Sequence, residues 1–581
     1  MFGEILEINN NRLIVKKNLN EGELNTYVKI VDTNNVFVGE IVSILQDRIE
    51  LKVMGVLSNN NFVFGVTSKP TLKAKIEALS NEEINILFGL NNYEANKNIY
   101  IGKSALYKDL PIVAKVNSLF ANHMAVLGNT GSGKSCGMTR VLQNIFYKRD
   151  SVAKNATIFI VDAYGEYKSA FSMINAVNPE LAFKSYSTEM ASDDDILQVP
   201  LWLLSLDDIC LLLGVTSKNQ IPIVEKALKL VTVFVKEEES VIKIKNSIIA
   251  KALLDIFISG NAPAAIRDQI FSVLTRYNTN ELNLDTQIYQ PGYTRPLKQC
   301  LLIDNTGKIR DTELVIQHLQ KYVMDNITLD FPDGTFAYTL KDLLYAFDFA
   351  LIDEGMLNDD SIYSKNHELR VHLSSIIESD QSKFFEFNTY FDKEDFFFML
   401  THQNDQKCQV INLNLNNLDD RFAKVIAKIY SKFLFDYAKK KRNDRASEPI
   451  HIVLEEAHRY VQNDSDVEIL GYNIFERIAK EGRKYAILLN LISQRPSELS
   501  QTVFSQISNY LVFKISHPAD IDYIKPLIPY VDDEMVEKIK NLQTGHCLIF
   551  GSSVNFPTII KVDMPTPEPT SNSCDISKTW F

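Results

Sequence analysis

The segment GNTGSGKS, Gly128–Ser135, constrains the fold of this chain more than any other feature. It fits the pattern G-x-x-x-x-G-K-[ST], in which the backbone N–H groups of a glycine-rich loop surround the phosphates of a nucleotide. The apolar run Met124–Leu127 before it predicts a buried strand, and Cys136–Leu142 after it predicts a helix. Because a helix N-terminus presents unpaired N–H donors and a partial positive charge, we expect a strand–loop–helix unit that binds a nucleoside triphosphate.

The residues of this loop have distinct expected tasks. Lys134 reaches the β- and γ-phosphates, and the Ser135 hydroxyl holds Mg²⁺. The alternative is a chance glycine-rich turn, which the flanking strand and helix disfavour. The residues expected to bind the nucleotide here are Gly128, Asn129, Thr130, Gly131, Ser132, Gly133, Lys134, Ser135 and Cys136.

Composition limits the class of protein. The chain has 581 residues, which suggests about three or four structural units. Its net charge is −12, from 61 basic and 73 acidic residues, so any DNA contact has to be local rather than due to an overall basic field. The six cysteines lack metal-binding spacing. No stretch is as long and apolar as a membrane span, and the N-terminus lacks the layout of a signal peptide. We therefore expect a soluble, cytoplasmic protein with no membrane partner.

The first hundred residues contain short β-type runs separated by Asn- and Gly-containing turns. Strands this short and closely spaced predict a small antiparallel β-barrel at residues 1–75, with a loose β-meander as the alternative. Residues 76–121 are expected to connect it to the core. The runs are Arg12–Lys16, Tyr27–Val31, Val36–Leu45, Arg48–Met54 and Phe62–Val66.

The predicted core is split along the sequence. Its first part, residues 122–190, contains the loop and the strand Thr157–Val161, which ends in the segment DAYGEY. Its second part, residues 401–560, alternates helices with apolar runs. Such alternation predicts an α/β fold, a RecA-like P-loop NTPase core with a mostly parallel sheet covered on both faces. The apolar runs are Cys408–Leu413, Ile450–Leu454, Ala486–Ile492, Leu511–Ile515 and Cys547–Phe550.

Residues 191–400, between the two parts of the core, contain mainly helical patterns. Thr339 and Asp342 have the spacing of a capping box. We expect an inserted helical domain, the alternative being that some of its helices belong to the core; residues 561–581 follow as a C-terminal tail. The amphipathic segments are Val224–Val235, Ile242–Ile258, Ala264–Tyr277, Leu340–Leu351 and Glu368–Phe387.

Two adjacent carboxylates, Glu455 and Glu456, follow the apolar strand Ile450–Leu454. A phosphate loop needs a partner that activates water, and a carboxylate pair at the end of a strand suits that task. Alternation along a strand would point only one of them inward, but both reach the site if the chain already turns there. The alternative is an acidic pair exposed to solvent.

Three further polar residues flank the strand Ala486–Ile492. Gln494, just after it, is placed to sense the γ-phosphate or to orient water. Arg477 and Arg483, before it, suit an arginine finger supplied in trans, which stabilises transition-state charge across a subunit boundary. For each arginine the alternative is an exposed helix face.

Together these segments resemble the HerA-type ATPases of the HerA/FtsK superfamily. The similarity lies in ANHMAVLGNTGSGKS, VDAYGEY, VLEEAHRYV, AKEGRKYAILLNLISQRPSELS and SQISNYLVFKISHPAD. It implies a β-barrel in front of a RecA-like core with a helical insertion. It also implies a homohexameric ring that uses ATP and Mg²⁺ to move double-stranded DNA, with an effector docked on the barrel end. Effectors in the family include a NurA-type nuclease, a sirtuin-like NADase and other nucleases, in DNA-end processing or antiphage defence.

The resemblance also implies roles for single residues. Asp162 and Glu166 match the family's D-x-x-G-E-Y near the nucleotide. Two departures concern Lys480, where the family commonly has Arg, and Ala163-Tyr164, which replaces Pro-His and excludes a histidine there. The implied roles are Mg²⁺ binding by Ser135 and Glu455, water activation by Glu455 or Glu456, γ-phosphate sensing by Gln494, and an arginine finger for the site of the neighbouring subunit from Arg477 or Arg483.

The sequence thus predicts an ATP-dependent double-stranded DNA translocase. The alternative from another class is a ring-shaped scaffold in which ATP switches an effector on without sustained translocation. A small-molecule kinase fits poorly, because LEEAH and SQRPSELS have no role there. DNA-contacting pore residues are not placed, since no local run combines strong positive charge with aromatic residues.

Overall fold

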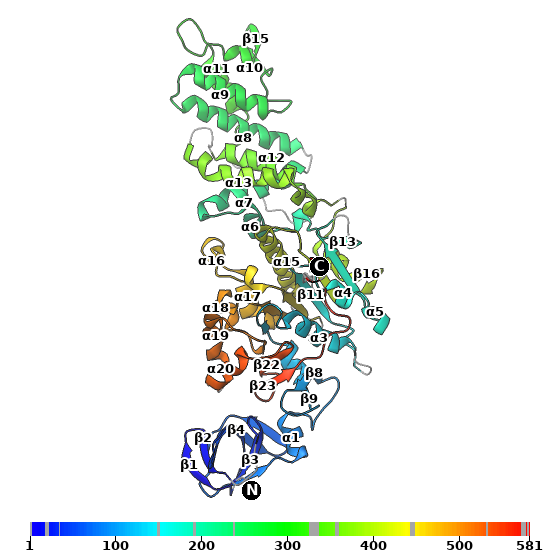
Figure 1. Ribbon diagram of the computed structural model, residues 1–581. Coiled ribbons are helices and arrows are strands. Elements are labelled where there is room, and N and C mark those ends of the chain that lie inside the picture. Colours follow the sequence, from blue (N-terminus) through cyan, green and yellow to red (C-terminus); the bar gives the residue numbers. More distant parts are fainter. Residues whose placement is uncertain are drawn as a thin grey trace. The chain divides into compact units, whose positions relative to one another are not determined.

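The computed structural model describes residues 3–17, 23–33, 35–147, 151–189, 193–235, 239–324, 336–354, 360–387, 389–441, 448–529, 533–570, 577 and 580. Of the expected C-terminal tail, residues 571–576, 578–579 and 581 therefore lie outside the described residues. The chain forms two compact units (Figure 1). Unit 1 comprises Met1–Asp195, Met399–Asp464 and Asn473–Phe581, and unit 2 comprises Ile196–Phe398 and Ser465–Tyr472.

The N-terminal part of unit 1 is a curled antiparallel sheet in the order β1-β2-β5-β4-β3-β7, with β6 paired to β5. Alternate side chains such as Leu13, Ile30 and Ile41 are buried in one hydrophobic cluster inside the curl. Within the described residues β1 and β7 form the two edges and do not pair, so the expected barrel is a curled sheet that hydrogen bonds do not close. Its strands are β1 Ile5–Asn9, β2 Arg12–Lys16, β3 Tyr27–Val31, β4 Val36–Ile44, β5 Arg48–Ser58, β6 Asn61–Phe64 and β7 Lys75–Ala78.

The core of unit 1 is a 12-stranded sheet in the order β13-β12-β18-β11-β19-β20-β10-β21-β22-β23-β8-β9. From β12 to β21 neighbouring strands are parallel, and from β21 to β9 they are antiparallel. The strands are β8 Asn98–Ser104, β9 Pro111–Lys115, β10 Met124–Leu127, β11 Thr157–Asp162, β12 Phe183–Ser187, β13 Asp195–Ile196, β18 Val410–Asn414, β19 Ile450–Leu454, β20 Ile487–Ser493, β21 Asn509–Val512, β22 His546–Gly551 and β23 Thr558–Lys561.

Burial explains which strands form the centre of this sheet. Every residue of β10, β11, β19 and β20 is buried, as expected of parallel strands with near-continuous apolar runs. The segment 76–121, expected to be a connector, instead contributes β8 and β9 to the antiparallel edge. Local pattern does not reveal this, because β8 pairs with β23, more than 400 residues away in sequence.

Helices flank the strands of unit 1. Helix α3 contacts β8 and β10, and α15 contacts β19 and β20. The helices of this unit are α1 Asn81–Leu87, α2 Val116–Phe120, α3 Lys134–Phe146, α4 Lys168–Phe171, α5 Ile174–Val177, α15 Asp420–Lys440, α17 Ile474–Glu481, α18 Gln501–Phe504, α19 Pro518–Ile524 and α20 Asp533–Lys540; a small hairpin is formed by β16 His402–Gln403 and β17 Gln406–Lys407.

Unit 2 is mainly helical. The predicted capping box at the start of α12 is present, with the Thr339 side chain accepting from Asp342 N. The expected helix Glu368–Phe387 is divided into two elements: α13 begins at Asp360 and ends at Glu378, and the Ser379 side chain then caps a separate 3₁₀ helix, Asp380–Phe385. The elements are α6 Leu206–Leu213, α7 Ile221–Val235, α8 Glu239–Ile258, α9 Pro263–Arg276, α10 Leu297–Cys300, α11 Thr312–Gln320, α12 Leu340–Asp353, α13 Asp360–Glu378 and α16 Asp466–Ile469, with the hairpin β14 Gln287–Gln290 and β15 Tyr293–Pro296; α14, Lys393–Thr401, crosses the boundary of the two units. Across the described chain, no helix is both long and apolar enough to cross a membrane.

Candidate nucleotide site

The predicted phosphate loop joins the end of β10 to the start of α3. Gly128 and Gly133 have φ of 156° and 104°, a region that side chains strongly disfavour. A Cβ at Gly133 would lie 3.2 Å from Gly545 N, and one at Gly128 would lie 2.7 Å from both Phe513 Cβ and Ser132 Oγ. The loop therefore takes its course because glycine stands at these two positions.

Contacts within the loop hold Lys134 over it. Lys134 Nζ donates to Asn129 O at 3.0 Å, and Ser132 Oγ donates to the same oxygen at 2.7 Å. The Lys134 side chain is buried, and burial lowers its pKa, while Glu456 and Glu455 act in the opposite direction. The ammonium group is thus held, largely out of water, in a position to meet a phosphate.

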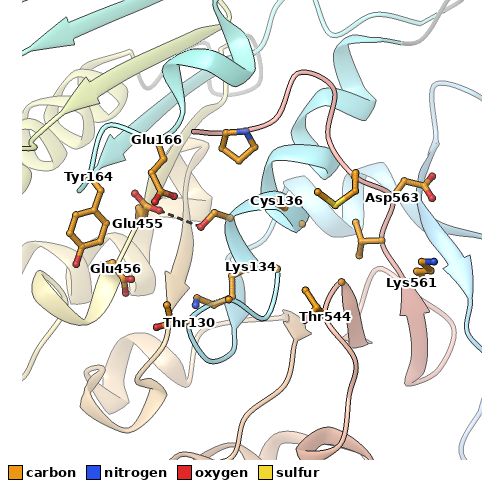
Figure 2. Close-up of a pocket in the computed structure, with 18 residues that line it drawn as sticks. Thr130, Lys134, Cys136, Tyr164, Glu166, Glu455, Glu456, Thr544, Lys561 and Asp563 are labelled. Atoms are coloured by element: carbon orange, nitrogen blue, oxygen red, sulfur yellow. Dashed lines mark hydrogen bonds between the residues drawn. The ribbon is translucent and has the colours of Figure 1, made fainter. Parts of the chain in front are cut away.

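Both predicted carboxylates point into the same cavity. Glu455 ends β19, and Glu456 then adopts a left-handed conformation with φ of 47°, which is costly for a residue other than glycine and occurs mainly at functional sites. This turn removes the strand alternation that would have sent Glu456 to the opposite face. Ser135 Oγ donates to Glu455 Oε1 at 3.4 Å (Figure 2). Within the described residues Glu455 Oε2 is buried and has no hydrogen-bond partner.

The carboxylates form a concentration of negative charge. Burial raises the pKa of Glu455 well above its ordinary value, and Asp162 and Glu166 raise it further. Burial also raises the pKa of Glu456, whereas Lys134, Arg459 and Arg495 lower it. A divalent cation bound between Ser135 and Glu455 would offset this charge and occupy the vacant lone pairs of Glu455. The residues present therefore fit the predicted Mg²⁺ site.

Replacing Glu455 with Gln should stabilise the nucleotide-free chain at neutral and alkaline pH. Because burial raises the pKa of Glu455 in the folded state, this carboxyl group costs stability as pH rises from the unfolded pKa through the folded one. At about pH 8 we expect a melting temperature a few degrees above that of the wild type, since about 1 kcal/mol shifts a domain's melting temperature by about 2–4 °C. The gain should shrink as pH falls to about 4, below the ordinary pKa of a glutamate, where both states hold the proton.

The matched variant for that measurement is Glu456→Gln. Its gain should be smaller, because three cationic side chains already offset the charge of Glu456. The measurement compares the melting temperatures of both variants with that of the wild type by thermal scans across the pH series. A Glu455→Gln chain that becomes less stable relative to wild type as pH rises would contradict this account of the charge cluster.

Asp162 stabilises the turn that follows β11. Its carboxylate accepts hydrogen bonds from the backbone N–H groups of Gly165 at 2.8 Å and of Glu166 and Tyr167 at 3.0 Å. Asp162 is fully buried and does not line the cavity. It instead shapes the turn that brings Tyr164 and Glu166 to the cavity wall. Asp162 therefore positions neighbouring residues, while Glu166 lies beside the expected nucleotide.

The cavity has a volume of about 590 Å³, with walls from three separate parts of unit 1 (Figure 2). Seven of its lining residues belong to the predicted loop and the start of α3, namely Thr130, Gly131, Gly133, Lys134, Ser135, Cys136 and Gly137. One wall of this cavity was not predicted from the sequence. It is formed by the end of β23, the first residues of the tail and the turn before β22. No local motif marks this wall, because these segments are not contiguous in sequence. The missed residues are Thr544, Gly545, Lys561, Val562, Asp563, Met564 and Pro569.

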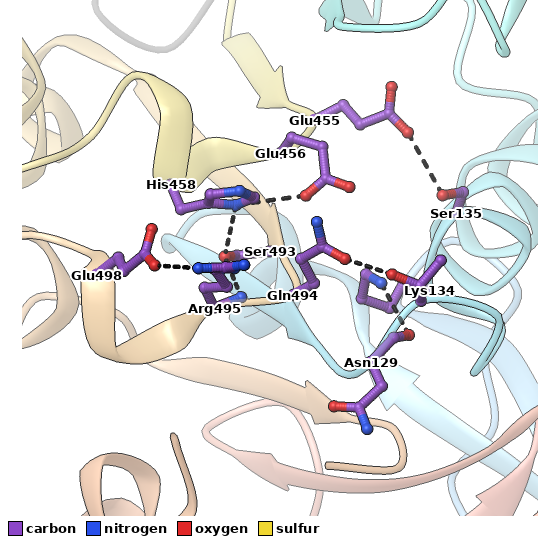
Figure 3. A network of polar contacts seen from close by, with 11 residues as sticks. Asn129, Lys134, Ser135, Glu455, Glu456, His458, Ser493, Gln494, Arg495 and Glu498 are labelled. Atoms are coloured by element: carbon purple, nitrogen blue, oxygen red, sulfur yellow. Dashed lines mark hydrogen bonds and ion pairs between the residues drawn. The ribbon is translucent and has the colours of Figure 1, made fainter. Parts of the chain in front are cut away.

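Gln494 lies on the other side of the loop. It forms a hydrogen bond with the Thr130 hydroxyl and lines a second cavity of about 440 Å³ together with Asn129 and Thr130. Next to Gln494, His458 Nδ1 lies 3.3 Å from Glu456 Oε2 and 3.4 Å from Ser493 Oγ (Figure 3). Polar contacts thus connect the end of β20 with both the loop and the carboxylate pair.

The two predicted arginines lie outside both cavities. Arg477 is on α17, with its guanidinium 5.4 Å from the centre of the Phe435 ring and 3.9 Å from Glu481. Arg483 is exposed in the turn after α17. Within one chain, therefore, the structure does not bring either arginine to the phosphate loop.

Three features together define a P-loop NTPase fold. They are the glycine-rich loop at the N-terminus of α3, the buried Lys134, and the carboxylate pair at the end of β19, which is separated from β10 by one parallel strand. A family model described as "Helicase HerA, central domain" matches residues 99–511. The chain belongs to this family, which confirms the resemblance seen in the sequence.

Individual relatives agree with the family match. The chain is 22% identical over 577 residues to a "Probable DNA double-strand break repair helicase HerA" of Methanocaldococcus jannaschii, covering 97% of this chain and 92% of that protein. It is 30% identical over 171 residues to the "DNA double-strand break repair helicase HerA" of Sulfolobus acidocaldarius, covering 29% of this chain and 34% of that protein. The chain thus matches about a third of the length of that second relative. Among solved structures, the plasmid coupling protein TrwB in complex with ADP and Mg²⁺ is similar with a TM-score of 0.43 and 10% identity, covering 84% of this chain and 93% of that one.

Proposed function

We propose that this protein is an ATP-hydrolysing motor that moves double-stranded DNA. The observation that carries the proposal is the convergence of Lys134, Ser135, Glu455 and Glu456 on one cavity in a chain of the HerA family. Relatives of the chain are named as DNA double-strand break repair helicases, and the proposal extends that activity to this chain.

In the proposed reaction the loop N–H groups and Lys134 hold the β- and γ-phosphates of ATP. Ser135 and Glu455 hold Mg²⁺, because the Ser135 hydroxyl and the Glu455 carboxylate face each other. Bound Mg²⁺ supplies charge that offsets the phosphate oxygens. Glu456, which faces Lys134 and contacts His458, accepts a proton from the attacking water.

Gln494 then reports the presence of the γ-phosphate. Its side chain contacts Thr130 in the loop, and it follows directly after Ser493, which contacts His458. A change at the phosphate is thereby passed to the segment Arg495–Glu498 after β20, where Arg495 and Glu498 form an ion pair at 2.7 Å.

The finer parts of the proposal concern assembly and partners. We propose a homohexameric, cytoplasmic ring in which Arg483 or Arg477 acts on the nucleotide of the neighbouring subunit; the position of both arginines outside the cavities of their own chain supports this. An effector such as a NurA-type nuclease, a sirtuin-like NADase or another nuclease docks on the N-terminal sheet, in DNA-end processing or antiphage defence. Resemblance to the family supports these parts.

DNA binding with a steep dependence on salt is the expected result that tests the motor. With a net charge of −12 the outer surface should repel DNA, so contacts should come from lysines and arginines gathered in a ring lumen. If six subunits give two phosphate contacts each, log affinity should fall against log salt with a slope on the order of −10. Sequence preference should be weak, because backbone contacts carry no base information.

The measurement compares linear and circular duplexes in a salt series and records ATPase stimulation by each. Linear DNA should bind better, because a closed ring does not admit an internal segment. Lys134→Ala serves as the hydrolysis-deficient control for stimulation. If no DNA binds under any condition while effector activity still depends on ATP, the ring-scaffold alternative replaces the motor.

A further inference from the structure

The wall of the nucleotide cavity that the sequence did not reveal is built by the C-terminal segment Lys561–Pro569 together with Thr544 and Gly545. In the view of Figure 2, Glu455, Glu456 and Tyr164 lie on one side of Lys134, and Asp563 and Lys561 lie on the other. In ATP the γ-phosphate is at one end and the nucleoside at the other. If the γ-phosphate faces the carboxylates that activate water, the nucleoside must extend toward Asp563.

Hydrogen bonds attach this wall to the phosphate loop. Gly545 N donates to Ser132 O at 3.0 Å, and Val562 N donates to Gly545 O at 2.9 Å. A Cβ at Gly133 would lie 3.2 Å from Gly545 N, so loop and wall are in close contact. The wall is thereby attached to the loop that is expected to hold the phosphates.

Beyond Asp563 the segment is docked along α3. The Gln143 side chain, which is fully buried, donates to Pro567 O at 2.8 Å and accepts from Thr566 N at 2.9 Å. At the far end, Ser169 Oγ donates to Glu568 O at 2.8 Å. A buried amide paired in both directions with the backbone indicates a fixed position rather than a loose tail.

Asp563 is the acidic group of this wall. Its Oδ2 accepts a hydrogen bond from the Tyr100 hydroxyl at 2.8 Å, which fixes the direction of the carboxylate. Within the described residues no hydrogen bond occupies Oδ1. An ionised carboxylate only accepts hydrogen bonds, so its partner on the nucleoside must be a donor: the exocyclic amine of adenine or a ribose hydroxyl.

We propose that Lys561–Pro569 forms the nucleoside-binding end of the ATP site and that Asp563 determines specificity by accepting a hydrogen bond from the nucleoside. This inference rests on the proposed function, because it assumes that the cavity binds ATP. It adds to that function a selectivity for nucleosides that carry a donor at this end. A nucleoside that lacks the donor would leave the Asp563 carboxylate unpaired.

The experiment measures the affinity of the full-length chain for three diphosphates, which are not hydrolysed: ADP, 2′-deoxy-ADP and purine riboside diphosphate, which lacks the 6-amino group. For the wild type we expect one of the two altered nucleotides to bind at least about tenfold more weakly than ADP, the usual loss for a hydrogen bond to a charged group. A loss with purine riboside diphosphate assigns the contact to the base, and a loss with 2′-deoxy-ADP assigns it to the ribose.

The variant Asp563→Ala, which leaves no acceptor on this side chain, should bind ADP more weakly and lose this discrimination. Asp563→Leu also removes the acceptor and serves as the test if the first variant does not fold. Asp522→Ala, which removes an exposed carboxyl group on α19 outside the cavity, is the matched control and should behave as wild type. If wild type binds ADP through Lys134 but Asp563→Ala keeps both affinity and discrimination, only this inference is overturned. If wild type does not bind ADP, the proposed function itself is wrong.

Discussion

Replacing Lys134 with Ala should abolish ATP turnover. Lys134 is buried in the cavity with Glu455 and Glu456, and we propose that its ammonium group binds the β- and γ-phosphates. Removing one preorganised donor from such a site costs about 10²–10³-fold in rate. Here the loss should be at least that large, because phosphate binding weakens as well. Steady-state ATP hydrolysis and calorimetric binding of ATP are the two measurements.

Two further variants serve as comparisons for Lys134→Ala. Glu456→Gln should lose turnover yet keep ATP affinity, because it removes the proposed proton acceptor and not a phosphate contact. Lys108→Ala, an exposed lysine between β8 and β9, should match the wild type in both measurements. Full turnover by the Lys134→Ala chain would refute the assignment of the site.

Arg483→Ala should lower turnover by about 10³-fold or more, the effect of losing an arginine finger. Arg483 is the better candidate of the two arginines because it is exposed, whereas Arg477 is engaged with Phe435 and Glu481. Arg477→Ala is therefore the matched comparison and should retain more activity.

Complementation shows whether the arginine acts in trans. Mixing Arg483→Ala subunits with Lys134→Ala subunits should restore part of the activity. At mixed interfaces an intact phosphate loop from the first variant meets an intact Arg483 from the second. Activity of the mixture is measured together with oligomeric state by light scattering. A monomer with full specific activity, or a mixture no more active than its components, would exclude an arginine supplied in trans.

Sequence alone determined those parts of the protein that depend on contiguous residues. The phosphate loop, the strand Ile450–Leu454 and the capping box at Thr339 occur as expected, because turn glycines, apolar runs and caps act within a few residues. The α/β fold and the family were predictable for the same reason: their motifs are short and local.

Only the tertiary structure decided features that depend on distant contacts. The left-handed turn at Glu456 brings both carboxylates to the cavity, and no residue type in that turn predicts a left-handed conformation. The role of Asp162 as a support depends on the backbone amides that it meets in the folded turn. The proposed nucleoside wall includes a hydrogen bond between Tyr100 and Asp563, which are 463 positions apart in sequence. Periodicity and propensity carry no information on such pairs, because only packing of the whole sheet brings them together.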